Sequence, residues 1–318
     1  MVIRKYIDVG SGRLGMAFVY QDIRNPILLV CGGGPGIPEY LLEWLRPSVL
    51  SRFFNVCFLD WRGTGLSYCK SQDAKDMTRE RYVSDIHEVT LYLKREYKRE
   101  KIYLMGHSFG TFIAVEVSRK FPNDYYAYLS MSQIVDQAES EYRAYDYMIE
   151  AYSKQGDRKS ALRLIDYNIK ESVEAKERYF RSSLRDRSMH RLGIGTMRDM
   201  HSVINGLFLP SFRCGFYSLG ERFAIWRAKF FSDKFPVVRD ALEFDAFGAG
   251  AIFEIPVFCI VGQYDYTCNH DLQKEYFGKL SAPIKRLYVF PDAAHSPIFE
   301  NTEKAGTVLK EIISLSSK

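Results

Sequence analysis

The pentapeptide Gly106–Gly110 (GHSFG) constrains the fold of this 318-residue chain more than any other stretch. The run Lys101–Met105 before it is typical of a buried strand, and Thr111–Ser118 after it is typical of a helix packed on a sheet. A serine between two glycines at such a junction predicts a tight turn that raises its hydroxyl above the sheet. At a helix N-terminus, N–H groups and the helix dipole favour developing negative charge. A chance match in a loop is the alternative, and both flanks argue against it.

The order of apolar runs along the chain predicts the fold class. Ile27–Cys31, Asn55–Leu59 and Tyr126–Met131 read as strands covered on both faces, with helical stretches between them. This alternation predicts an α/β fold with a mostly parallel central sheet flanked by helices. The pattern stops after residue 131, where charged and aromatic helical stretches follow, and it returns at Glu254–Gly262. We expect a core of residues 1–131 and 246–318, and an inserted helical cap, or lid, of residues 132–245.

Composition and charge limit the possible partners. The formal net charge of +5 is mild and gives no case for a nucleic-acid partner. No run approaches the length of a transmembrane helix, so we expect no membrane partner. The six cysteines form no Cys-x-x-Cys pair, and the N-terminus is too short in apolar residues for a signal peptide. These features predict a cytoplasmic protein, and they leave a monomer or a homo-oligomer open.

Two strand ends downstream of Ser108 carry the partners that a serine nucleophile needs. A serine hydroxyl requires a base, usually a histidine oriented by a buried carboxylate. Asp265 lies just beyond the strand-like run that ends at Gly262, and His295 lies just beyond the last such run. We therefore predict a catalytic triad of Ser108, Asp265 and His295, in the order typical of this turn. Asp292 is a rival acid close to the histidine.

The glycine-rich loop Cys31–Pro38 (CGGGPGIP) follows a central strand and predicts an oxyanion hole. Glycines let the backbone approach a bound group and turn an N–H toward it. The N–H of Gly34 is the preferred donor, with Gly33 as second choice, and the N–H of Phe109 is the other donor. A phosphate-binding loop is the alternative. The segment lacks the Lys-Ser/Thr ending and the spaced glycines of such loops.

A fourth segment, Asp60–Ser67 (DWRGTGLS), follows the run Asn55–Leu59 and predicts a turn. Its acidic and basic side chains, Asp60 and Arg62, are placed for a structural ion pair. We assign this segment a scaffolding role.

With these segments placed, the chain resembles the α/β-hydrolase superfamily over its full length and, more narrowly, its prolyl iminopeptidase (proline aminopeptidase-like) branch. Members of that branch carry a His-Gly-Gly-Pro-Gly loop, which Gly32–Gly36 matches at all but the first position. They also carry Asp-x-Arg-Gly-x-Gly-x-Ser, matched by Asp60–Ser67, and the Gly-x-Ser-x-Gly turn, matched by Gly106–Gly110. Their acid and base correspond to Asp265 and His295.

Two features separate this chain from that branch. Gly32 stands where the branch has a histidine that helps to shape the oxyanion loop, so we expect a loop that is supported differently. The resemblance also implies a cap carboxylate for the amino terminus of a peptide, because an ammonium buried without a partner is costly. Glu221 is the preferred candidate, followed by Glu139 and Glu141. Trp226 is a candidate for the lining of an apolar substrate pocket.

The resemblance implies a serine hydrolase that works through an acyl-enzyme, with an aminopeptidase of the prolyl iminopeptidase type, acting on small peptides or amides, as the first expectation. A carboxylesterase or lactonase on small apolar acyl substrates is the alternative. A non-catalytic ligand-binding protein on the same fold is the second alternative. The expected partner is a small-molecule or short-peptide substrate, and neither a metal nor an organic cofactor is implied.

Overall fold

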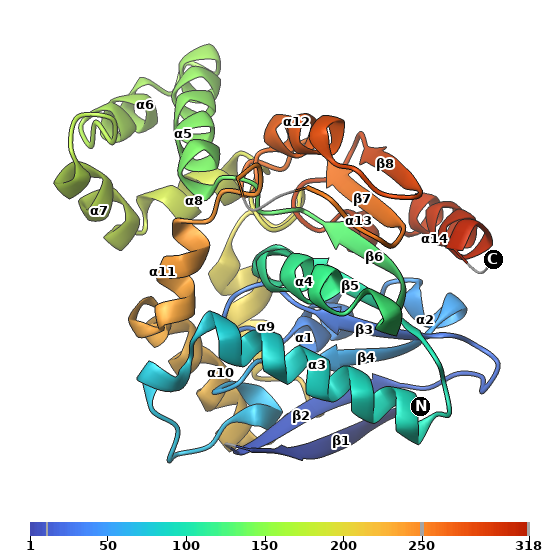
Figure 1. The fold of residues 1–318 in the computed structure, drawn as a ribbon. Coiled ribbons are helices and arrows are strands. Elements are labelled where there is room, and N and C mark those ends of the chain that lie inside the picture. Colours follow the sequence, from blue (N-terminus) through green and yellow to red (C-terminus); the bar gives the residue numbers. More distant parts are fainter. Residues whose placement is uncertain (11, 249–250, 317–318) are drawn as a thin grey trace.

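The computed structural model describes residues 1–10, 12–248 and 251–316, and its centre is an eight-stranded sheet (Figure 1). The strands follow the spatial order β1-β2-β4-β3-β5-β6-β7-β8. β2 pairs antiparallel with β1 and β4, and the other pairs are parallel. The strands are β1 (Val2–Val9), β2 (Gly12–Val19), β3 (Ile27–Cys31), β4 (Asn55–Leu59), β5 (Ile102–His107), β6 (Tyr125–Met131), β7 (Val257–Gly262) and β8 (Lys285–Phe290).

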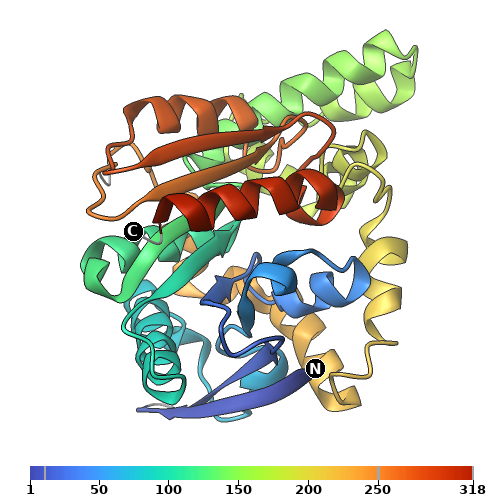
Figure 2. The same cartoon turned by 90° about the vertical axis from the view of Figure 1, so that its right-hand side faces the viewer.

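Helices cover both faces of the sheet, as the two views show (Figures 1 and 2). Successive residues of β3 alternate between two buried clusters, because side chains of a strand point to opposite faces. Leu29 packs in the cluster that includes α3, α4 and α12, whereas Leu28 and Val30 pack in the cluster that includes α1, α2 and α14. The predicted α/β class with a mostly parallel sheet is confirmed. The flanking helices are α1 (Glu39–Leu45), α2 (Leu50–Phe53), α3 (Arg79–Glu96), α4 (Phe109–Lys120), α12 (His270–Lys279), α13 (Pro297–Glu300) and α14 (Thr302–Ser316).

Between β6 and β7 the chain leaves the sheet and forms a run of helices. α5 and the short helices after it project from one end of the sheet, as Figure 1 shows. These helices fall within the residues 132–245 that the sequence assigns to a cap, and that division into domains stays a prediction. None of the described helices is both long and apolar enough to span a lipid bilayer. The helices of this segment are α5 (Gln137–Lys154), α6 (Arg158–Ile165), α7 (Val173–Arg181), α8 (Leu184–Arg191), α9 (Leu209–Ser211), α10 (Leu219–Phe231) and α11 (Pro236–Leu242).

The helices α5 to α8 have a hydrophobic cluster of their own. α5 begins at an Asp136 cap whose side chain accepts from the N–H of Glu139 at 2.9 Å. Its residues Ala144, Met148 and Tyr152 recur at helical spacing and are buried in this cluster. α10 and α11 instead pack into the two clusters at the sheet. The segment after β6 therefore contains two packing units.

The ion pair predicted within the turn after β4 is wrong. Arg62 is buried and donates from Nε to Asp85 of α3 at 2.8 Å. Asp60 accepts instead from the N–H of Leu66 at 2.8 Å and from the hydroxyl of Tyr217 at 3.0 Å. The carboxylate partner of Arg62 therefore comes from the neighbouring helix and not from its own turn. The scaffolding role of the turn follows from these buried bonds.

Candidate active site

Ser108 stands at the junction of β5 and α4, in backbone angles that side chains rarely adopt. Its φ is +53° and its ψ is −123°, so the residue lies in a strained part of backbone space. A Cβ at Gly106 would lie 2.7 Å from the Cα of Thr111, and a Cβ at Gly110 would collide with the main-chain oxygen of Cys31. The sequence folds this way because only glycines fit on either side of the serine.

His295 and Asp265 form a buried pair beyond the ends of β8 and β7. The Nδ1 of His295 donates to the two carboxylate oxygens of Asp265 at 3.0 and 3.1 Å. Asp265 is fully buried and also accepts from the N–H groups of Thr267 and Cys268, each at 3.0 Å, and from the amide of Gln273 at 3.1 Å. Burial acts to raise the pKa of Asp265, but the charge and hydrogen bond of His295 outweigh it and hold the pKa below its usual value.

The rival acid, Asp292, lies elsewhere. Its side chain is exposed and makes no hydrogen bond or ion pair among the described residues. Ser108 and His295, by contrast, line one pocket of about 210 Å³ between the glycine loop and the cap helices. The structure therefore brings Ser108, His295 and Asp265 together and leaves Asp292 outside.

The two candidate oxyanion donors of the glycine loop differ in what their N–H groups contact. Gly33 lies beside the serine, since a Cβ there would be 3.4 Å from the Cβ of Ser108. Its N–H donates to Oε2 of Glu39 at 3.2 Å and is therefore occupied. The N–H of Gly34 has no hydrogen-bond partner within the described ranges, and Gly34 lines the same pocket. The geometry favours Gly34, together with the N–H of Phe109 at the start of α4.

A buried ion pair supports this loop in place of the histidine that Gly32 replaces. A Cβ at Gly32 would lie 2.7 Å from both Cβ and Oε2 of Glu39, so the Glu39 side chain occupies that space. His107 donates from Nδ1 to Oε1 of Glu39 at 2.7 Å and from Nε2 to the main-chain oxygen of His295 at 2.8 Å. Both ring nitrogens face oxygen atoms, an arrangement that favours the imidazolium form of His107.

The charges of this pair stabilise each other. Burial acts to lower the pKa of His107, yet the Glu39 carboxylate outweighs it and raises that pKa. Burial likewise acts to raise the pKa of Glu39, and the charge of His107 outweighs it and lowers that pKa. Sequence reasoning assigned no role to either Glu39 or His107. The available signal was the glycine at position 32, which leaves a gap that another side chain must fill.

The cap provides the charged wall of the pocket. From α8, Arg185 donates to both oxygens of Glu141, one of them at 2.7 Å, and to Asp186 at 2.7 Å. Asp186 lines the pocket and its side chain is 64% exposed, whereas Glu141 is buried behind Arg185. Although the Asp186 side chain is largely exposed, surrounding protein atoms partly desolvate its carboxylate and act to raise its pKa, and the charges of Arg185 and Lys229 outweigh this effect and lower that pKa. Lys229 enters the pocket from α10.

None of the four cap residues predicted to bind substrate lines this pocket; they are Glu221, Glu139, Glu141 and Trp226. Glu221 closes the N-terminus of α10 by accepting from the N–H of Ser218 at 2.6 Å, and it pairs with Arg4 at 3.3 Å. Glu139 pairs with Arg143 at 2.9 Å on α5. Trp226 is buried and donates to the hydroxyl of Ser211 at 2.8 Å.

Sequence reasoning missed Asp186 and Lys229, which line the pocket in their place. Both lie in a segment dense in charged residues. Nothing in the spacing of those charges distinguishes a side chain that faces a pocket from one that faces solvent.

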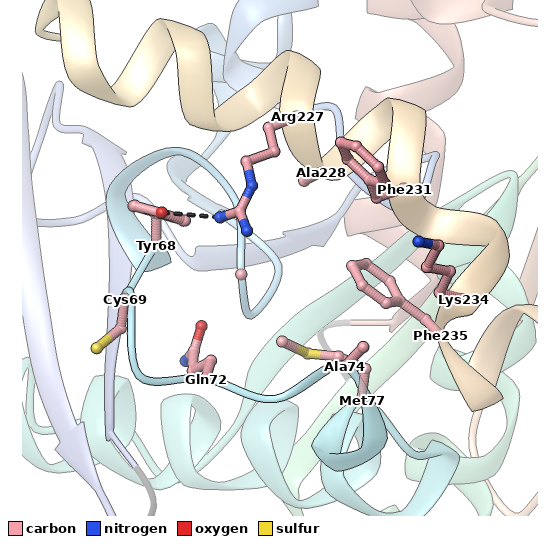
Figure 3. Close-up of a pocket in the computed structure, with 11 residues that line it drawn as sticks. Tyr68, Cys69, Gln72, Ala74, Met77, Arg227, Ala228, Phe231, Lys234 and Phe235 are labelled. Atoms are coloured by element: carbon pink, nitrogen blue, oxygen red, sulfur yellow. Dashed lines mark hydrogen bonds between the residues drawn. The ribbon is translucent and has the colours of Figure 1, made fainter.

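A second cavity, of about 270 Å³, lies between α10 and the loop that follows β4 (Figure 3). It shares no lining residue with the pocket at Ser108. Arg227 of α10 points into it and donates to the hydroxyl of Tyr68 at 2.8 Å, as the dashed line in Figure 3 shows. Ala228 lines this cavity and the next residue, Lys229, lines the other. α10 is therefore a wall of both.

The side chains of the described residues include no group of three or more histidine, cysteine, aspartate or glutamate residues placed to hold a metal ion. The polar groups at Ser108 are instead a hydroxyl, an imidazole paired with a carboxylate, and the N–H groups of a glycine loop. This set is suited to proton transfer and to stabilising a negative oxygen.

Comparison with known proteins agrees with this geometry. The protein family described as "alpha/beta hydrolase fold" matches residues 26–302. The chain is 27% identical over 319 residues to a Bacillus subtilis (strain 168) protein named "Probable aminopeptidase YbaC", covering 94% of this chain and 92% of that protein. The solved proline iminopeptidase of Mycobacterium smegmatis has a TM-score of 0.69 at 15% identity, covering 99% of this chain and 100% of that one. A thermophilic esterase from Thermogutta terrifontis has a TM-score of 0.60 at 19% identity, covering 100% of both chains.

Proposed function

Since the chain belongs to the α/β-hydrolase fold family, we propose that it is a serine hydrolase with Ser108 as nucleophile, His295 as base and Asp265 as orienting acid. One observation carries this proposal. The buried Asp265 accepts from Nδ1 of His295, and the imidazole lines the same pocket as the hydroxyl of Ser108. Holding Nδ1–H in this way leaves Nε2 as the nitrogen that accepts a proton.

The mechanism follows from these placements. His295 takes the proton of Ser108 as the serine oxygen attacks a carbonyl carbon, and Asp265 stabilises the imidazolium that forms. The N–H groups of Gly34 and Phe109 bind the negative oxygen of the tetrahedral intermediate. His295 then protonates the leaving amine or alcohol, which gives an acyl-enzyme. Water enters, His295 removes its proton, and a second tetrahedral step releases the acid and the free serine.

We propose an aminopeptidase of the prolyl iminopeptidase type, acting on small peptides or amides, as the activity. The name of the Bacillus subtilis relative, which contains the word aminopeptidase, supports it. A carboxylate in the pocket supports it as well, because an aminopeptidase must pair with the ammonium of its substrate. Asp186 of the cap is that carboxylate.

An esterase or lactonase is the second candidate. One observation favours it: Arg185 and Lys229 line the pocket beside Asp186 and offset its negative charge. A pocket balanced in this way also accepts neutral acyl compounds.

Hydrolysis assays on a panel of substrates test both candidates. The panel contains proline p-nitroanilide, other aminoacyl arylamides, short p-nitrophenyl esters and lactones. Ser108→Ala should lower kcat by at least about a thousandfold, the usual cost of removing a triad member. Ser153→Ala, which removes an exposed hydroxyl of α5, serves as the matched control and should retain activity.

A fluorophosphonate probe gives a second readout. It should label the wild type, and should fail to label Ser108→Ala and His295→Ala. Full activity in Ser108→Ala would refute the triad. A higher kcat/KM on the arylamides than on the esters would support the aminopeptidase. The reverse order would support the esterase.

A further inference from the structure

We propose that Lys229 forms a carboxylate-binding subsite in the active-site pocket, so that the substrate is a small acyl compound that carries a free carboxylate. This inference rests on the proposed function, because it assumes that the pocket at Ser108 receives the substrate. A dipeptide is the simplest such compound. Its amino terminus and its C-terminal carboxylate both lie within a few bonds of the amide that is cleaved.

Lys229 lies close to the proposed oxyanion loop. It stands in the last turn of α10, where the helix backbone packs against the glycine loop. A Cβ at Gly36 would lie 2.7 Å from the backbone nitrogen of Lys229. Lys229 and Gly34 line one pocket together with Ser108. A ligand whose carbonyl meets the serine therefore shares a small space with the Lys229 side chain.

The ammonium of Lys229 is left without a bonded partner. Among the described residues it makes no hydrogen bond and no ion pair, although it lines a pocket that also contains Asp186. The other cation of this wall, Arg185, is already bonded to Glu141 and Asp186. Lys229 is exposed to solvent in the pocket, so a carboxylate ligand can replace water as the hydrogen-bonded partner of its ammonium.

The charge and the size of the pocket narrow the class of anion. Lys229 offers one unpaired positive charge, and the exposed side chain of Asp186 repels a second negative charge on the ligand. A monoanionic carboxylate therefore fits better than a phosphate dianion. The pocket volume of about 210 Å³ is small, below the roughly 300–1,000 Å³ of pockets for drug-sized ligands. A substrate bearing an ammonium as well can place it at Asp186.

The test compares substrates that differ only in the carboxylate. The first pair is the dipeptide Pro-Ala and its amide, prolyl-alaninamide. The second pair is 4-carboxyphenyl butyrate and phenyl butyrate, in which the carboxylate lies on the leaving group as it does in Pro-Ala. Each pair is assayed for kcat/KM with the wild type, Lys229→Met, the rescue variant Lys229→Arg, and Arg227→Met. Arg227 is the matched control, because it is a cation of the same helix that faces the second cavity (Figure 3).

We expect the wild type to prefer the carboxylate member by about 10- to 100-fold, as for a hydrogen bond between charged groups. Lys229→Met should abolish this preference by lowering kcat/KM much more for the carboxylate member than for the uncharged member. Lys229→Arg should restore part of it, and Arg227→Met should behave as the wild type. Equal rates on both members in the wild type would overturn the inference. So would an equal loss on both members in Lys229→Met, which is the signature of a structural role.

Failure of the proposed function gives a different result. In that case the wild type hydrolyses neither pair. Titration calorimetry of Pro-Ala into Ser108→Ala, with and without Lys229→Met, then decides on the subsite. Binding that Lys229→Met abolishes supports it, and absent or unchanged binding overturns it.

Discussion

The imidazole of His107 donates through Nε2 to the main-chain oxygen of His295 at 2.8 Å. The neighbour of the proposed nucleophile is thus bonded to the backbone of the proposed base. The hydroxyl of Ser132, which follows β6, donates to the same oxygen at 2.8 Å. Because Glu39 holds the opposite side of the His107 ring, one buried ion pair links the glycine loop, the serine turn and the base loop.

Removing the acid of that pair should destabilise the fold. Glu39→Gln leaves the ring of His107 buried without its counter-charge, and breaking a buried pair costs about 3–5 kcal/mol. The free energy of unfolding, measured by urea denaturation, should fall by an amount of this order. The double variant Glu39→Gln/His107→Gln removes both charges and should regain part of the loss. A single variant as stable as the wild type would show that the pair contributes nothing to stability.

The same pair predicts how stability depends on pH. The pKa of folded His107 is raised above its usual 6.5, so the pair's contribution is complete below pH 6.5 and is lost as pH rises through the raised value. The pKa of Glu39 is lowered from 4.5, so its contribution is present above pH 4.5 and is lost as pH falls through the lowered value. Urea midpoints of unfolding, measured from pH 3 to 9, should show the loss of stability at high pH and the loss at low pH. The double variant should show neither of them.

The identity of the orienting acid can be tested by two isosteric substitutions. Asp265→Asn removes the carboxylate that holds Nδ1–H of His295 and should lower kcat by about 10⁴, the effect known for this change in a serine protease triad. Asp292→Asn alters an exposed side chain with no bond to the histidine and should leave kcat unchanged. Steady-state assays on the best substrate of the panel give kcat for both variants and so identify the orienting acid. The reverse pattern would assign the role to Asp292.

A second carboxylate fixes the base loop to the cap. Oε1 of Glu300 accepts from the N–H groups of Ala294 and Ser296 at 2.9 and 3.1 Å, and Oε2 accepts from the N–H of Arg198 at 2.6 Å. Glu300→Gln replaces one acceptor oxygen by an NH₂ group, so a donor must then face a donor whichever way the amide turns. We expect a loss of about 1–3 kcal/mol in the free energy of unfolding, the usual cost of a buried unsatisfied group. Thermal unfolding monitored by circular dichroism measures it, and Glu303→Gln on the exposed start of α14 is the control.

The sheet and the placement of Ser108, Asp265 and His295 could be predicted because each depends on a local pattern. Apolar runs mark the parallel strands, and the carboxyl ends of parallel strands meet at one edge of a sheet. Chemically useful residues that follow such runs therefore come together in space. Two glycines around a serine fix the turn in a similarly local way.

The residues that support the glycine loop and the charged residues that line the pocket could not be predicted, because their positions depend on contacts between distant segments. Glu39 acquires its role only when α1 packs beside β5, which places its carboxylate against His107. Asp186 and Lys229 meet only when α8 and α10 close over the glycine loop. The charge pattern of the cap shows none of this, and Glu221, the preferred candidate for a cap carboxylate, instead caps α10.

α5 to α8 pack in a hydrophobic cluster of their own, whereas α10 packs against the sheet. Substitutions in the α8 wall and in the α10 wall of the pocket should therefore have different structural effects. Arg185 and Asp186 belong to α8, so substitutions around them disturb the packing of that small unit and leave the contacts of the sheet intact. Lys229 belongs to a helix whose Ile225 and Trp226 pack into the main cluster and whose backbone touches Gly36. Substitutions in the α8 wall should therefore disturb the sheet less than substitutions in the α10 wall, so the α8 side of the pocket is the easier one to reshape.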